Sequence, residues 1–144
     1  MTDSWVNLNN VPRKTLLLKD KFKVDVYSTT INVIVASSLE DVSKRVIKLC
    51  KDNNVSYDDV DPKLNGYVIS FHNNARTYYV FYAQENLTYN TVCHEAHHLS
   101  KMIIEFNGIV EKDIAEAEAN LNAFINDKII SLLHAEGIVI GYES

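Results

Sequence analysis

Apolar and polar residues alternate in the first third of the chain in a pattern that predicts β-structure. Phe22, Val24 and Val26 are separated by polar residues, and an apolar run follows at residues 31–35. A period of two is typical of a strand with one buried face. We therefore expect a hairpin or one bent strand over residues 22–36.

A helical period follows this β-region. Ser37 and Glu40 have the spacing of a capping box, in which the serine bonds a backbone N–H of the first turn. Apolar residues then recur at helical spacing and should face a sheet: Leu39, Val42, Val46 and Leu49. A first helix is expected over residues 39–52, ending at Asn53 and Asn54.

The rest of the chain predicts two more strands and then two helices. An Asp- and Asn-rich loop at 54–65 precedes an apolar strand at 66–71, and turn residues at 73–74 lead to an aromatic strand at 77–82. Helices are expected at about 91–106 and 112–134, closed by Gly108 and Gly137. Strands and a helix followed by two helices predict an α+β fold.

Composition excludes several classes of protein. The 144 residues suit one domain, residues 1–144, and 47% apolar with 23% charged residues is typical of a globular chain. A net charge of -5 argues against nucleic-acid binding, which needs a basic face. There is no apolar stretch long enough for a membrane span and no secretion signal at the start, so we expect a cytoplasmic protein without a membrane partner. Cys50 and Cys93 are expected to be small packing residues in this reducing compartment.

The segment His94-Glu95-Ala96-His97-His98 carries the candidate chemistry. His94 and His98 are four residues apart on the predicted helix, so both imidazoles can reach one zinc ion. Glu95 is rotated by about 100° and flanks the metal, where it can act as a general base rather than a ligand. Zinc lowers the pKa of a bound water to about 7, and the carboxylate completes its activation for attack on a peptide carbonyl.

A helical wheel separates this motif from the core. The residues expected to pack on the sheet form one narrow stripe: Val92, Ala96, Leu99, Ile103 and Phe106. His94 and His98 fall on the opposite side, which argues against ordinary core histidines. The remaining alternative is that the two histidines are a solvated surface pair. This alternative would be excluded if another segment of the chain brought a carboxylate to the same face.

The third zinc ligand has to come from elsewhere in the chain. Lys101 stands where the metzincin extension has glycine, so a glutamate of the next helix is the alternative. Glu116 and Glu118 are both available. The buried side of that helix is expected to comprise Ile114, Ala117, Leu121, Phe124, Ile125, Ile129 and Leu132. Glu118 falls inside this arc, where a zinc ion would compensate its charge, and Glu116 falls nearly opposite, so Glu118 is the preferred ligand.

These residues resemble a known pattern. The histidine motif, a helix end at Asn107-Gly108, and Glu118-Ala119-Asn120 followed by Ala123-Phe124 are similar to gluzincins, with ImmA/IrrE-type and small phage-encoded metallopeptidases as the nearest pattern. The resemblance covers about residues 88–126. It implies a minimal zincin-like fold, with a small twisted, mostly antiparallel sheet, an active-site helix and a C-terminal helix that carries the glutamate.

The leading hypothesis is therefore zinc-dependent hydrolysis of a peptide or protein substrate, which could pair as an extra strand along the sheet edge. The alternatives are a zincin-fold protein that keeps the metal but cleaves nothing, and a metal-free interaction domain. Tyr89 and Tyr142 could stabilise an oxyanion, but nothing in the sequence selects between them and the other tyrosines.

Overall fold

The computed structural model describes residues 15–56, 66–71, 74–109 and 111–142. The chain opens with the strands β1 (Leu16–Val24) and β2 (Thr29–Ala36), which pair antiparallel. A short 3-10 helix, η4 (Asp25–Tyr27), and Ser28 at a left-handed φ of 50° make the turn between them. The predicted hairpin is confirmed, and its first strand begins six residues before the alternation is evident.

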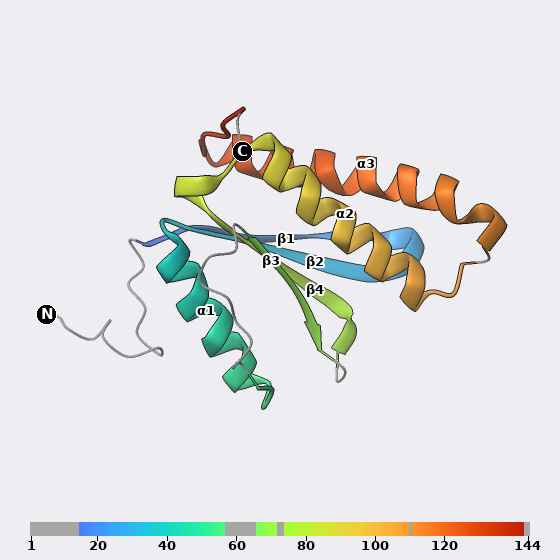
Figure 1. The fold of residues 1–144 in the computed structure, drawn as a ribbon, viewed down its shortest axis with the longest axis horizontal. Helices are drawn as coiled ribbons and strands as arrows, with labels where there is room; N and C mark the ends of the chain where they lie inside the picture. The colour runs from blue at the N-terminus through green and yellow to red at the C-terminus, as the bar shows by residue number, and fades with distance from the viewer. Residues whose placement is uncertain (1–14, 57–65, 72–73, 110, 143–144) are drawn as a thin grey trace, which may run out of the picture.

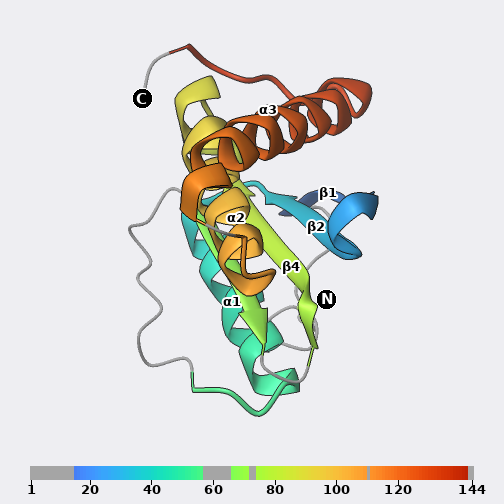
Figure 2. The same ribbon diagram turned by 90° about the vertical axis from the view of Figure 1, so that its right-hand side faces the viewer.

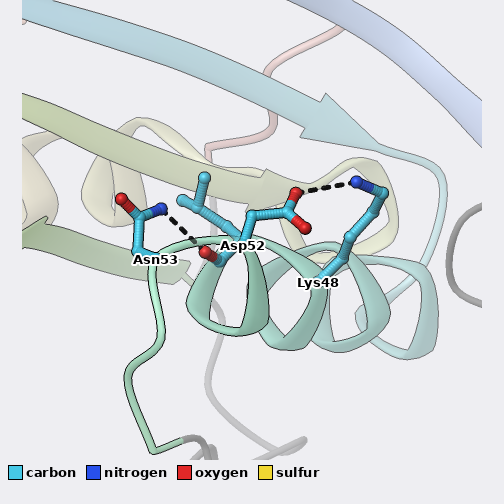
Figure 3. Close-up of polar contacts among 4 residues, drawn as sticks. Lys48, Asp52 and Asn53 are labelled. Carbon is cyan, nitrogen blue, oxygen red and sulfur yellow. Dashed lines mark hydrogen bonds and ion pairs between the residues drawn. The ribbon is translucent and has the colours of Figure 1, made fainter.

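The helix α1 (Leu39–Asp52) has the predicted bounds. Its N-cap is Ser38 rather than the predicted Ser37, because the Ser38 hydroxyl accepts the hydrogen bond from the Asp41 N–H at 3.2 Å. Figure 3 shows the other end, where the Asn53 side chain donates to the Leu49 carbonyl at 2.8 Å and Lys48 pairs with Asp52. Most of the predicted loop at 54–65 lies outside the described residues.

The strands β3 (Gly66–Phe71) and β4 (Asn74–Ala83) pair antiparallel and complete a four-stranded sheet of order β1-β2-β4-β3. The first has the predicted bounds, and the second begins three residues before the prediction. In the centre β2 and β4 run parallel, and α1 and β3 come between them in the chain. The α+β class is confirmed, with a mixed sheet that has two antiparallel pairings and one parallel pairing.

After a 3-10 turn, η5 (Gln84–Asn86), the helix α2 (Tyr89–Phe106) crosses the sheet. Its N-cap is Thr88, whose hydroxyl accepts from the Thr91 N–H at 3.0 Å. The end of the chain reinforces this turn, since the Tyr89 N–H donates to the Gly141 carbonyl and the Gly141 N–H to the Leu87 carbonyl, both at 2.9 Å. The segment that carries the histidine motif is thus fixed at its start.

The helix α3 (Glu111–Ala135) runs back along α2, and the Tyr89 hydroxyl lies 3.3 Å from the His134 imidazole. Figures 1 and 2 show three layers, with α1 on one face of the sheet and α2 and α3 on the other. The larger core lies beneath α2 and α3, and the smaller one, around Val42 and Val46, lies beneath α1. No helix within the described ranges is long and apolar enough to cross a membrane.

Three expectations about burial were wrong. Phe106 is 48% exposed because it lies at the very end of α2, where its ring meets the Arg76 guanidinium instead of the core. Phe124 is 39% exposed and packs edge-to-face on Phe22 of β1. Cys93 is exposed, whereas Cys50 is buried as expected. The other four residues of the predicted α2 stripe, from Val92 to Ile103, are fully buried.

Candidate metal centre

His94 and His98 lie one turn apart on the outer face of α2, and both are exposed as the wheel predicts. Their rings meet edge-to-face with centroids 4.7 Å apart, and the two Nε2 atoms are 3.1 Å apart. The Nε2 atoms of the two imidazoles therefore lie next to each other on the exposed face of the helix.

This separation suits two ligands of one ion. Two nitrogens that each lie about 2.0–2.1 Å from a tetrahedral zinc are about 3.3 Å apart, close to the observed distance. In the metal-free chain, two neutral imidazoles at 3.1 Å can instead share one N–H hydrogen bond. The distance between the two Nε2 atoms is thus compatible with two positions of a tetrahedral zinc site.

The pair borders a pocket of about 310 Å³ between α2 and the edge strand β3. Three residues of β3 line one side, and four residues of α2, including the two histidines and Glu95, line the other. The lining comprises Gly66, Tyr67, Val68, His94, Glu95, His98 and Met102. The candidate centre is therefore at the edge of the sheet, next to the outer side of β3.

Glu95 turns inward from the histidines and is only 7% exposed. Burial raises the pKa of this carboxyl above its ordinary value, and the nearby His94 acts in the opposite direction. Burial raises the pKa of the Tyr82 phenol, and the charge of the nearby Glu95 carboxylate raises it further. The Tyr82 hydroxyl lies 3.4 Å from the Val92 carbonyl oxygen. Glu95 is thus held at the floor of the pocket, where the motif predicts a general base.

His98 has an environment that favours its neutral form. Partial burial of the ring, together with the neighbouring His94 and His97, lowers the pKa of His98 below its ordinary value. A metal binds only the neutral imidazole, so this shift reduces proton competition at neutral pH. His97 itself is exposed, with its ring centroid 6.4 Å from that of His98.

The structure does not bring the predicted third ligand to this pair. Glu118 is partly buried on α3 and Glu116 is exposed, which matches the wheel, but neither lines the pocket beside the histidines. Glu116 instead borders a different, more apolar pocket near the β1–β2 turn. Within the described ranges, no three His, Cys, Asp or Glu side chains converge into a group that could hold a metal ion.

The two tyrosines considered for oxyanion stabilisation lie elsewhere. Tyr89 and Tyr142 pack against each other with centroids 5.1 Å apart, near the first turn of α2. Neither lines the pocket that His94 and His98 border. The tyrosine that does line it is Tyr67, whose ring packs against the core cluster on the α1 side of the sheet.

No direct signal in the sequence indicates the β3 side of the pocket. Gly66, Tyr67 and Val68 were predicted as an ordinary strand, because their pattern does not show that this strand lies at a sheet edge beside α2. One available hint was that the strand begins with a glycine, which often marks a close approach of backbone to another group.

Comparisons of the chain with family models, with curated proteins and with solved structures found no match.

Proposed function

We propose that this protein hydrolyses peptide bonds with the help of a zinc ion held by His94 and His98, with Glu95 as the general base. The observation that carries the proposal is the combination of two Nε2 atoms 3.1 Å apart with a buried carboxylate in the same pocket. A pair of surface histidines with no function does not explain why Glu95, which lies between them in sequence, is buried, since burying an acid is unfavourable.

Each residue has a separate role in this proposal. His94 and His98 contribute neutral nitrogen ligands, which the lowered pKa of His98 favours. When bound, zinc would supply a Lewis acid and a water of lowered pKa. Glu95 would accept the proton of the attacking water. Its raised pKa lies closer to neutral pH than that of an ordinary glutamate, which makes the carboxylate a stronger base for this step.

The position of the pocket supports a peptide as substrate. β3 is an edge strand, and its residues Gly66, Tyr67 and Val68 form one wall of the pocket. An extended peptide can add to such an edge through main-chain hydrogen bonds. A peptide bound in this way would pass directly beside His94 and His98.

Glu118 stays the prediction for the third protein ligand. It is partly buried on α3, as the wheel predicts, and it matches the resembling metallopeptidases. The arrangement of the described residues does not itself join it to the histidines, so its role has to be tested by metal content.

Hydrolysis is tested with a mixture of fluorescence-quenched peptides and purified, zinc-loaded protein. We expect Glu95→Gln to lower turnover by about 100-fold or more while zinc content stays near that of the parent, because the base is lost and the histidines remain. His94→Ala and His98→Ala should lose both. Zinc binding without cleavage of any peptide by the parent would favour the runner-up, a zincin-fold protein that keeps the metal and cleaves nothing.

A further inference from the structure

Gly66 is a buried glycine at the start of β3 whose presence the backbone does not require. Gly108 and Gly137 have positive φ values of 64° and 76°, which favour glycine. Gly66 is not among the positive-φ glycines, so an alanine could adopt its backbone conformation. Glycine loses more conformational freedom on folding than alanine does, so in a strand it is ordinarily the less favourable residue.

The space around Gly66 explains the glycine. A Cβ atom built there would lie 3.0 Å from the Glu95 Cγ, 3.1 Å from the Glu95 Oε2 and 3.1 Å from the Phe81 carbonyl oxygen. Real Cβ atoms rarely have neighbours this close. Gly141, the other glycine without a positive φ, has its nearest neighbour at 3.4 Å, which is an ordinary contact.

We propose that Gly66 is a positioning residue for Glu95: its missing side chain lets the edge strand lie directly against the carboxylate and hold it at the floor of the histidine pocket. The catalytic consequence rests on the proposed function, whereas the steric coupling between Gly66 and Glu95 does not. A methyl group at position 66 would require the Glu95 side chain and the Phe81 carbonyl to move away by a few tenths of an ångström, which shifts the Glu95 carboxylate or separates β3 from α2.

The first test measures stability and needs no substrate. Gly66→Ala, Glu95→Ala and the double variant are compared with the parent by thermal unfolding in the presence of a chelator. We expect Gly66→Ala to lower Tm by about 3 °C or more in the parent. In the Glu95→Ala background, where Cγ and Oε2 are gone, the loss of Tm should be smaller by at least about 2 °C. The residual contact with the Phe81 carbonyl remains in both backgrounds.

Equal losses in the two backgrounds, or a Gly66→Ala variant as stable as the parent, would overturn the proposal. If Gly66→Ala alone does not fold, the double variant decides, because recovery of folding by Glu95→Ala is expected and its absence would contradict the coupling. Gly141→Ala is the matched control, and the Glu95→Ala substitution should not change its effect on Tm.

The second test concerns the site. In zinc-loaded protein we expect Gly66→Ala to keep the zinc content of the parent, to lower kcat by about tenfold or more, and to change KM much less, because a displaced base affects the reacting geometry. Gly141→Ala should keep the parent kcat. A parent that neither binds zinc nor cleaves peptides would refute the proposed function while the Tm coupling still stands. Unchanged kcat in Gly66→Ala, with active parent, would refute the positioning role.

Discussion

Among the acidic side chains of the described residues, Glu95 is the buried one. His94 and His98 are exposed on α2, whereas the Glu95 side chain packs against Gly66 at the start of β3. The spacing of the motif predicts that Glu95 flanks a metal as a base, and this role stays a prediction. The spacing could not predict the burial, which depends on a strand nearly thirty residues earlier in the chain.

Burial of Glu95 has a consequence for stability that depends on pH. The pKa of the Glu95 carboxyl is raised in the folded chain. In the unfolded chain this carboxyl has its ordinary pKa of about 4.3, so it loses its proton at a lower pH there than in the folded chain. Stability is therefore lost as pH rises through the raised pKa. In the presence of a chelator, we expect Glu95→Gln to raise Tm at pH 7 and to have little effect near pH 4. A Tm at pH 7 equal to or below that of the parent would contradict this account.

The third ligand is also decided at the level of single residues. The sequence predicts that Glu118→Gln loses more zinc than Glu116→Gln, which serves as its matched control on the same helix. Metal analysis after dialysis against zinc measures both. Equal or greater loss in Glu116→Gln would overturn the choice of Glu118. Full retention of zinc by Glu118→Gln would show that Glu118 does not fill the third position, in keeping with its absence from the pocket that the histidines border.

At the scale of elements, local sequence signals predicted the helices well. The predicted bounds of α1 were correct, and those of α2 and α3 were correct within about two residues. The N-cap residues and the glycines that end helices are adjacent to the helix in sequence, so they can be recognised locally. Burial was predicted less well. A wheel describes one helix alone, so it does not show that the Phe106 ring meets Arg76 or that Phe124 packs on Phe22.

α1 is scaffold in this account, since it covers the face of the sheet opposite α2. Val46 is fully buried there. We expect Val46→Ala to lower the free energy of unfolding by about 1–3 kcal/mol through lost burial and a small cavity. Zinc content and turnover below the melting transition should equal those of the parent. Selective loss of turnover at unchanged Tm would refute this assignment.

At the scale of the whole molecule, the sequence predicted the α+β class but not the strand order. Alternation shows which face of a strand is buried and not which strand lies beside it, so the parallel pairing of β2 with β4 and the edge position of β3 came only from the structure. The same limit applies to the site. His94, Glu95 and His98 are local to one helix and were predictable, whereas the β3 wall of the pocket is not local.

We propose that His94 and His98 bind one metal ion, which can be measured as the zinc content of the purified chain after dialysis against zinc and removal of the excess. We predict about one zinc per chain in the parent and in a His97→Ala control, and loss of that zinc in His94→Ala and in His98→Ala. A parent without bound zinc, or variants that keep it, would contradict the account.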